Sequence, residues 1–414
     1  MVQLRALGSD AILCMTQGES STNTIAAATS ALSISFIDPT TLQDVRAALT
    51  GTHADRINEL GFMGPDVLYS ASSDGTVKLW DAKQAANKPQ AEFRDATATH
   101  GTSGGTSGEI WTAASEGGSN LLAAGTESAV AVWDVRKANA APVARYEVHT
   151  EAVTQVRFKP AGGSGILLSG SVDALLCEID TRIADEDEAV LNVINTEGPV
   201  SSLGFYGTDL SRAWVLSSTD VVSTWDLAAG DCLGVRDNLV AHKADDFLLG
   251  EARSRERGAD GRLPIDFVVG VHWDAASSRL VLVGGDQGGA VHVFEIGAAT
   301  APPTPLQSLK AGSGHVDAVR CFRFGAGLAS ITTGGEDGRL CSWVPAAAAA
   351  PKIGAALGTA SQTSSSSSSA AAASSAPAGG KAKKSHKEEA RSKAKPYDRP
   401  ASSKTKVGAP RDDE

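Results

Sequence analysis

The sequence of 414 residues lacks the features of membrane-spanning and secreted proteins. It contains no run of 18 or more apolar residues, which excludes a transmembrane helix. Its start, MVQLRALGSDAILCM, has one arginine and no sustained apolar segment, so we expect no secretory signal. The five cysteines have no short paired spacing, which predicts reduced thiols in the cytosol or nucleus, without a disulfide framework or a zinc ribbon.

Basic residues are scarce over most of the chain. The net charge is −11, but residues 346–414 hold 12 Lys and Arg against 6 Asp and Glu, and the preceding 345 residues therefore carry −17. An acidic body is a poor match for nucleic acid, whose affinity for proteins comes largely from neutralised phosphates. Nucleic acid is therefore expected to contact only the basic tail, if at all.

A bulky apolar residue followed by an acid recurs along the chain. The pairs are Ile37-Asp38, Trp80-Asp81, Trp133-Asp134, Ile179-Asp180, Trp225-Asp226 and Phe294-Glu295, and Trp343 continues the series without the acid. Most of the intervals (43, 53, 46, 46, 69 and 49 residues) are near the period of about 40–45 that is typical of a four-stranded propeller blade. Period-two runs such as TVKLW and AVAVW precede the anchors, and no helical stripe occurs before residue 345. The sequence predicts an all-β repeat protein.

Two of these repeats carry the same four side chains at matching spacings. The sets are His53, Ser70, Asp74 and Trp80, and His315, Thr333, Asp337 and Trp343. The turn carboxylate can accept from the imidazole, the imidazole can bond the hydroxyl, and the hydroxyl can accept from the indole, so polar groups that a packed blade would bury are paired. Nucleophilic catalysis by Ser, His and Asp is disfavoured, because the set repeats in separate blades and includes a tryptophan.

These sets and the Trp-Asp pairs resemble WD40 repeats. The resemblance implies a seven-bladed WD40 β-propeller over residues 1–345, expected to be monomeric. The last repeat has only three strand-like segments (AVRCFRF, LASITT and RLCSW), and in WD40 propellers an N-terminal segment commonly completes the last blade. We therefore expect Val2–Leu7 to supply its fourth strand.

The C-terminal region differs in composition from the repeats. Residues 346–380 are a Ser/Ala-rich low-complexity linker with few large apolar side chains, and 381–414 are a basic tail, so we expect both to be disordered. The basic run is either a nuclear-import or nucleic-acid contact segment or a solvated tail. It favours a nuclear location slightly over a cytoplasmic one.

Other motifs with possible chemistry are weak. The glycine-rich stretches 100–109 and 284–290 lack the strand-to-helix context of a phosphate site, so we interpret both as loops. The histidines and acids match neither HExxH nor an EF-hand, so no metal site and no cofactor are expected.

One motif points to a specific partner. Trp133-Asp134-Val135-Arg136 resembles the box of WD40 substrate receptors of cullin–RING ubiquitin ligases, in which the arginine helps to engage the ligase's large propeller adaptor. Arg182 follows a degenerate box in the next repeat, whereas Trp80-Asp81-Ala82-Lys83 has a lysine, which does not replace the planar fork of arginine. The alternative is that Arg136 is an ordinary exposed residue.

These patterns favour binding over chemistry. The first hypothesis is a non-enzymatic scaffold that binds other proteins through loops on a rigid frame, with no membrane partner. The second is the ligase substrate receptor, through Trp133, Asp134, Arg136 and Arg182. The third is a propeller enzyme, which requires polar groups that converge in the central channel.

Overall fold

The structure is a computed structural model. It describes residues 2–18, 24–84, 87–95, 108–117, 119–160, 163–237, 239–240, 263–297, 301–310 and 314–344. The expected linker (346–380), the basic tail (381–414) and most of the glycine-rich stretch 100–109 lie outside this part. In the described ranges no helix is long and apolar enough to cross a membrane.

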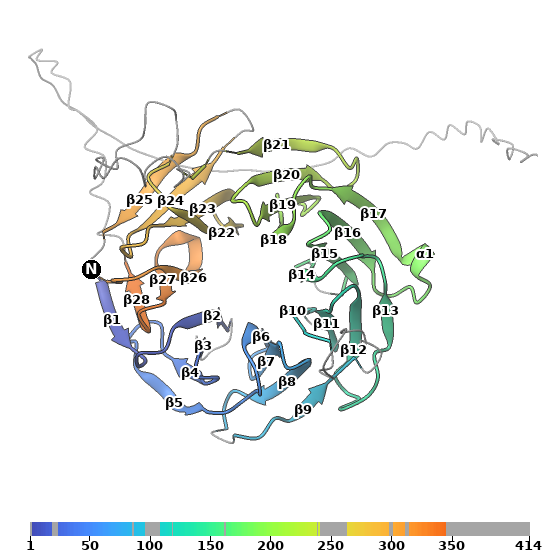
Figure 1. The fold of residues 1–414 in the computed structure, drawn as a ribbon, viewed down its shortest axis with the longest axis horizontal. Helices are drawn as coiled ribbons and strands as arrows, with labels where there is room; N and C mark the ends of the chain where they lie inside the picture. Colours follow the sequence, from blue (N-terminus) through green and yellow to red (C-terminus); the bar gives the residue numbers. More distant parts are fainter. Residues whose placement is uncertain are drawn as a thin grey trace, which may run out of the picture. The chain divides into compact units, whose positions relative to one another are not determined.

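Seven antiparallel four-stranded sheets form a ring around a central opening (Figure 1). Blades 1 to 3 comprise β2 (Ile12–Gln17), β3 (Ile25–Thr29), β4 (Ile34–Ile37) and β5 (Asp44–Leu49); β6 (Ile57–Met63), β7 (Val67–Ser72), β8 (Thr76–Asp81) and β9 (Ala91–Phe93); and β10 (Thr112–Ser115), β11 (Leu121–Gly125), β12 (Val130–Asp134) and β13 (Ala144–Tyr146). Blades 4 and 5 comprise β14 (Val153–Phe158), β15 (Ile166–Ser171), β16 (Leu175–Asp180) and β17 (Val190–Asn195), with α1 (Glu186–Ala189) before β17; and β18 (Val200–Tyr206), β19 (Arg212–Ser217), β20 (Val222–Asp226) and β21 (Cys232–Arg236). Blades 6 and 7 comprise β22 (Phe267–Asp274), β23 (Arg279–Gly285), β24 (Val291–Ile296) and β25 (Thr304–Leu309); and β26 (Val319–Phe324), β27 (Ile331–Gly335), β28 (Arg339–Trp343) and β1 (Val2–Ala6), with a short 3-10 helix (Ala326–Leu328) after β26.

The predicted seven-bladed propeller is thereby confirmed. Each of the seven anchors, from Ile37 to Trp343, lies in the third strand of its blade. The first strands are innermost: each contacts the first strands of both neighbouring blades, and β26 contacts β2, so the ring is closed.

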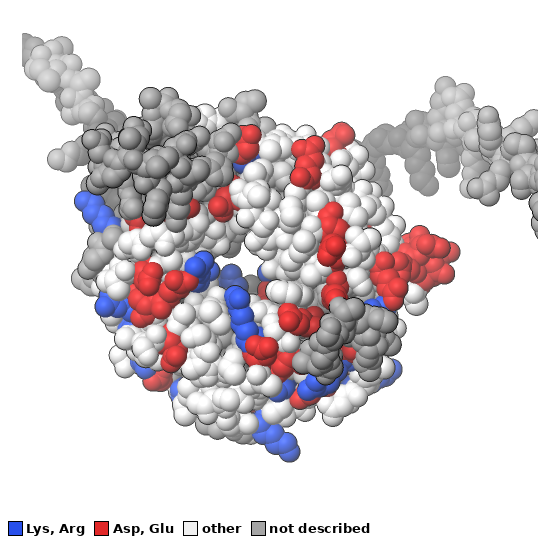
Figure 2. Space-filling model, viewed as in Figure 1, with Lys and Arg blue, Asp and Glu red and all other residues white. Residues whose placement is uncertain are grey.

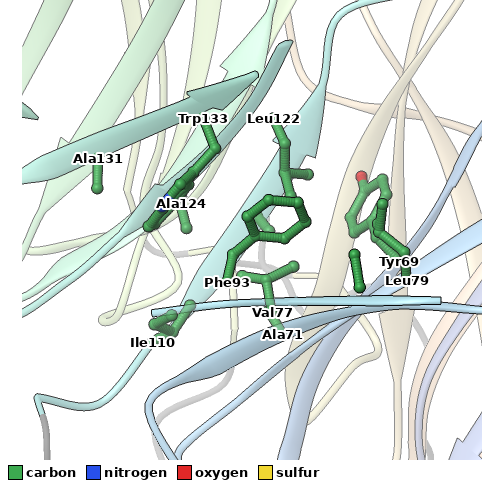
Figure 3. Close-up of a cluster of buried hydrophobic side chains, with 12 residues drawn as sticks. Tyr69, Ala71, Val77, Leu79, Phe93, Ile110, Leu122, Ala124, Ala131 and Trp133 are labelled. Atoms are coloured by element: carbon green, nitrogen blue, oxygen red, sulfur yellow. The ribbon is translucent and has the colours of Figure 1, made fainter. Parts of the chain in front are cut away.

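The core lies between neighbouring blades. Figure 3 shows one such interface, where Val77 and Phe93 of blade 2 face Leu122 and Trp133 of blade 3. Phe93 and Trp133 are fully buried, with ring centroids 6.1 Å apart. Large aromatic side chains in such contacts contribute most of the apolar area that stabilises a blade against its neighbour.

The strand registers define two faces of the ring. The top face is the side of the ring that carries the loops leading into each first strand and the turns between the second and third strands. The bottom face carries the turns between first and second strands and the loops that leave each third strand. The turn of Asp74 and the loop of His53 are on the top face, whereas Arg136 and Arg182 are on the bottom face.

Strand β1 closes blade 7, where the sequence analysis placed it. It pairs antiparallel with β28, from Val2 opposite Trp343 to Ala6 opposite Arg339 (Figure 1). Arg5 extends this contact to blade 1, because its Nη1 donates to the Leu42 carbonyl at 2.9 Å. The N-terminal strand therefore joins the last blade to the first.

Deletion of residues 1–7 should lower the free energy of unfolding by about 3 kcal/mol or more, the cost typical of losing the packing around one large buried side chain such as Trp343. Leu4→Thr is the matched control, because Leu4 is 47% exposed and threonine keeps the backbone ladder. Urea titration of the three proteins checks the expectation. An unchanged midpoint for the deletion would show that β1 does not stabilise the ring.

Candidate functional site

The structure brings the four predicted side chains of blade 2 together. His53 Nδ1 lies 2.9 Å from Asp74 Oδ2, and His53 Nε2 lies 2.6 Å from Ser70 Oγ. Trp80 donates its indole N–H to the same Ser70 oxygen at 2.8 Å. Asp74 also accepts the backbone N–H of Ala54 at 3.0 Å, which ties the loop entering the blade to the turn.

The Asp74 carboxylate is stabilised in its charged form. Burial alone would raise its pKa, but hydrogen bonds from His53, Thr76 and the Ala54 N–H outweigh burial and lower the pKa of Asp74. The pair contributes stability wherever this carboxylate is ionised, and the contribution is lost as the pH falls through the lowered pKa.

Blade 7 repeats this arrangement. His315 Nδ1 is 3.0 Å from Asp337 Oδ1, His315 Nε2 is 2.9 Å from Thr333 Oγ1, and the Trp343 indole donates to the same hydroxyl at 2.9 Å. Asp337 accepts the Val316 N–H at 2.8 Å. The two sets therefore have one geometry in two blades.

A third set, in blade 4, was missed by the sequence analysis. His149 Nδ1 lies 3.1 Å from Asp173 Oδ2, His149 Nε2 lies 2.9 Å from Ser169 Oγ, and Asp173 accepts the Thr150 N–H at 2.9 Å. Ile179 stands where the sets of blades 2 and 7 have tryptophan. The missed signal is the His-Thr-Glu-Ala-Val run at 149–153, which parallels His-Val-Asp-Ala-Val at 315–319.

These sets are not arranged for nucleophilic attack. The hydroxyl-bearing residues Ser70, Ser169 and Thr333 are all fully buried. In blades 2 and 7 the hydroxyl oxygen also accepts an indole N–H, so it is already engaged by two protein groups. The geometry fits a role in fixing the top-face loops.

Blade 3 has the tryptophan of these sets but lacks the serine or threonine hydroxyl that accepts the indole N–H. In blade 2, Leu68 pairs with Trp80, and Ser70 follows Leu68 by two residues. In blade 3, Leu122 pairs with Trp133, so Ala124 is at the position that corresponds to Ser70. Figure 3 shows Ala124 beside the Trp133 ring. The Trp133 Nε1 atom is buried and has no hydrogen-bond partner among the described residues. Glu127, which lies six residues before Trp133 as Asp74 lies before Trp80, is exposed.

The two arginines of the predicted ligase box are held by their own aspartates. Arg136 donates from Nε to Asp134 Oδ1 at 2.9 Å and from Nη2 to Asp134 Oδ2 at 2.6 Å, while 70% of its side chain remains exposed. Asp180 holds Arg182 in the same way, at 2.8 and 2.6 Å. The hydrogen bonds from Arg136 lower the pKa of Asp134 to about 2. Trp133 itself is fully buried, so only Asp134 and the arginines reach the bottom face.

A charged cluster in the central channel was also missed. Glu59 of β6 accepts from Arg157 of β14 at 2.7 Å and from the Ala113 N–H at 3.2 Å, so it spans blade 3. Burial tends to lower the pKa of Arg157, but Glu59 and Tyr69 raise it overall. Arg323 of β26 is close enough for its charge to interact with all three of these groups, although they belong to blades 2 and 4 and Arg323 to blade 7.

A cavity opens at the top of this channel. It has a volume of about 740 Å³ and is lined by Leu13, Ser30, Leu32, Ala54, Asp55, Arg56, Arg320 and Glu336. Arg320 is paired with Glu336, with Nε 2.6 Å from Oε1. Figure 2 shows basic and acidic side chains side by side around the central opening, with more of both over the rest of the visible face. Within the described ranges no three His, Cys, Asp or Glu side chains form a metal-binding group.

Comparisons with known proteins agree with this architecture. The family model "WD domain, G-beta repeat" matches residues 49–81, which contain the set of four hydrogen-bonded side chains in blade 2. The WD repeat-containing protein 89 homolog of Dictyostelium discoideum is 30% identical over 294 residues, 70% of this chain and 72% of its own length. WD repeat-containing protein GTS1 of Arabidopsis thaliana is 30% identical over 306 residues, 70% of this chain and 71% of its own length. A chain of the "Crystal Structure of Mitotic Checkpoint Complex" shares the fold, with a TM-score of 0.61 and 14% identity over 83% of this chain and 90% of that chain.

Asp74→Ala should lower the free energy of unfolding by about 2–3 kcal/mol, because it leaves the buried His53 imidazole and the Ala54 N–H without an acceptor. Asp81→Ala should cost about 1 kcal/mol or less, because Asp81 accepts only local bonds from residues of its own turn, such as the Lys83 N–H at 2.8 Å. Urea titration at pH 7 measures both. The difference between the two losses of unfolding free energy should become smaller as the pH falls through the pKa of Asp74. Equal losses of unfolding free energy at pH 7 would contradict the assigned roles.

Ala124→Ser should stabilise the protein by about 0.5–1.5 kcal/mol, because the new hydroxyl can accept from the buried Trp133 N–H. Ala123→Ser is the matched control: Ala123 is equally buried, but its side chain points to the opposite side of the sheet. The denaturant midpoints of the two variants and the wild type test this expectation. If Ala124→Ser is no better than Ala123→Ser, the unpaired indole does not limit the stability of blade 3.

Proposed function

This chain belongs to the WD40-repeat family, and from that premise we propose that it is a non-enzymatic scaffold that binds other proteins through the loops of its propeller. Family membership supports a role in protein interaction. The features that support the proposal within the molecule are on the top face.

The observation that carries the proposal is a set of exposed apolar side chains on fixed loops. Trp111, Val172 and Val316 are 41%, 42% and 55% exposed, and all three lie in top-face loops or turns. Val316 is itself held, because its N–H is bound by Asp337. Large apolar side chains on preorganised loops are favourable for binding, since little conformational entropy is lost when a partner docks.

The polar layer beneath these loops supports the same function. In blades 2, 4 and 7 a buried carboxylate binds the backbone N–H of the residue that follows the histidine: Ala54, Thr150 and Val316. The loop entering each of these blades is thereby attached to the turn between its second and third strands. Loops on a rigid frame are the usual carriers of recognition in such folds.

A narrower function is supported by the bottom face. We propose as the alternative that Arg136, with Arg182 in the adjacent blade, binds the adaptor of a cullin–RING ubiquitin ligase. Asp134 occupies the Nε and Nη2 atoms of Arg136, whereas Nη1 has no hydrogen-bond partner in the described part of the chain. That side of the guanidinium is available to a carboxylate of a partner.

Affinity capture of the intact chain, with the bound proteins identified by mass spectrometry, tests both functions. We expect Trp111→Ala to reduce the captured amount of most bound proteins at least tenfold, because Trp111 is the largest exposed apolar side chain among the described residues of the top face. The matched control, Leu306→Ala, removes a similarly exposed side chain from the outermost strand of blade 6.

Arg136→Ala separates the two functions. If the ligase adaptor is captured by the wild type and lost with this variant, the receptor function holds; if the adaptor is never captured, that function is excluded and the scaffold remains. A chain that retains no protein under any condition would contradict the scaffold itself.

A further inference from the structure

A cleft opens between blades 5 and 6, which are neighbours in the ring (Figure 1). Its volume of about 460 Å³ is within the range typical of ligand pockets. The lining residues lie at the strand ends and turns of the bottom face. Blade 5 contributes one wall with a residue from each of its four strands, in order Tyr206, Arg212, Thr224 and Leu233, and blade 6 forms the facing wall.

The apolar packing between these two blades is interrupted by an arginine. Arg236 of β21 pairs with Val222, three residues before the anchor Trp225. The Arg236 side chain is buried, and its Nη2 donates to the carbonyl of Gly297 in blade 6 at 2.8 Å. The equivalent position of five other blades holds a large apolar side chain: Leu49, Phe93, Tyr146, Ile194 and Leu309. A polar contact therefore joins blades 5 and 6 where other blades use apolar packing.

The inner end of the cleft is aromatic. Tyr206, at the end of β18, and Trp273, near the end of β22, are half-buried and make an edge-to-face contact with ring centroids 5.9 Å apart. The buried side chains of Leu280 and Ile296 continue this surface along blade 6, and the exposed side chain of Leu233 lies on the outermost strand of blade 5. A ligand gains free energy when its apolar groups leave water for such a surface.

Two arginines flank the apolar surface, one on each wall. Arg212 is the first residue of β19 and Arg279 is the first residue of β23, so the two hold equivalent positions in neighbouring blades. Arg212 is exposed and forms no ion pair with a carboxylate of the described residues. Arg279 Nε lies 3.7 Å from Glu295 Oε1, which is too far for a hydrogen bond. Glu295 is the one acid in the lining, so the cleft has more positive than negative charge.

The acids in the adjoining turns of blade 5 are engaged locally. Asp209 accepts the Ser211 N–H at 3.2 Å, and Asp226 accepts the Ala228 N–H at 3.0 Å. Each carboxylate is thereby held in its own turn. The guanidinium of Arg212 therefore remains available to a carboxylate from another molecule.

The shape of the cleft suits an extended chain. The cleft crosses the four strands of blade 5, which are separated by three spacings of about 4.8 Å, or roughly 14 Å in all. An extended peptide advances about 3.3 Å per residue, so about four residues fit along this length.

We propose that the cleft binds an extended segment of a partner protein in which a large apolar residue is adjacent to one or two acids. The apolar side chain packs against Tyr206 and Trp273, and the carboxylates accept from Arg212 and Arg279. This site goes beyond the proposed scaffold function, because it is a second binding surface with its own ligand chemistry. It lies on the bottom face in blades 5 and 6, apart from the top-face loops and from the box of blade 3.

The first test selects a phage-displayed library of random seven-residue peptides on the full chain. The enriched peptides should combine a large apolar residue with adjacent acids. In fluorescence anisotropy they should bind the double variant Arg212→Gln, Arg279→Gln at least tenfold more weakly than the wild type. Enrichment of no peptide, or equal binding to wild type and double variant, would overturn the proposal.

Arg94→Gln is the matched control for this selection. The Arg94 side chain is 50% exposed and lies beside Glu92 in blade 2, much as the 47% exposed side chain of Arg279 lies beside Glu295. This variant should bind the peptides as the wild type does. Weakening as large as that of the double variant would show a general charge effect and would contradict a site in the cleft.

Trp111→Ala separates the cleft from the top-face loops. This variant should bind the enriched peptides as the wild type does, because Trp111 is on the other face. If Trp111→Ala loses the peptides and the double variant keeps them, the peptides dock on the top face. The cleft proposal then fails while the scaffold function stands.

Charge reversal tests for direct contact with the arginines. The variant Arg212→Glu, Arg279→Glu should bind an enriched peptide with its acids replaced by lysine at least tenfold more tightly than the wild type binds that peptide. A distorted cleft cannot produce such a reversal, because it would lose both peptides. Binding of the lysine peptide that is no tighter than to the wild type would overturn the pairing of the arginines with the ligand.

Discussion

The closed ring is the constraint on which the rest of this structure depends. Each blade buries both of its faces against a neighbour, so an open ring would expose two apolar sheet faces and a line of unpaired backbone groups. β1 prevents this by pairing with β28, and Arg5 links the same strand to the carbonyl of Leu42 in blade 1. Trp343, beside Val2 in this pairing, is then only 3% exposed. The top-face loops and the channel keep their geometry because closure fixes the positions of all seven innermost strands.

The fold could be predicted from the sequence because its signals are local and repeated. Pairs such as Trp80-Asp81 each lie within one repeat, and the period of these pairs identified the blades. The polar sets of blades 2 and 7 were predictable for the same reason, since His53 and Trp80 fall within one repeat. His149 was missed because the turn between β14 and β15 is longer, which places His149 30 residues before Ile179; the corresponding spacing is 27 residues in blade 2 and 28 in blade 7.

The channel cluster could not be predicted in this way. Glu59 and Arg157 come from blades 2 and 4, 98 residues apart, and neither stands in a recognisable motif. Both side chains also contact β10, which lies between them, so their contact exists only after blades 2, 3 and 4 have packed together. Similarly, nothing in the Trp-Asp-Val-Arg box indicated that Asp134 would hold Arg136 through two hydrogen bonds. The channel contact thus arises from the arrangement of the blades, whereas the Asp134–Arg136 pair lies within one repeat.

The pairing of β1 with β28 also orders the events of biosynthesis. The ribosome adds Trp343 341 residues after its partner Val2. At about 5–20 residues per second, this separates the two strands by roughly 17–70 s. During that interval blades 1 to 6 can form their hairpins, but β1 has no partner and blade 1 lacks one of its neighbours. Strand β1 can therefore pair only after β28 has been made, and the ring closes only after translation has passed residue 343.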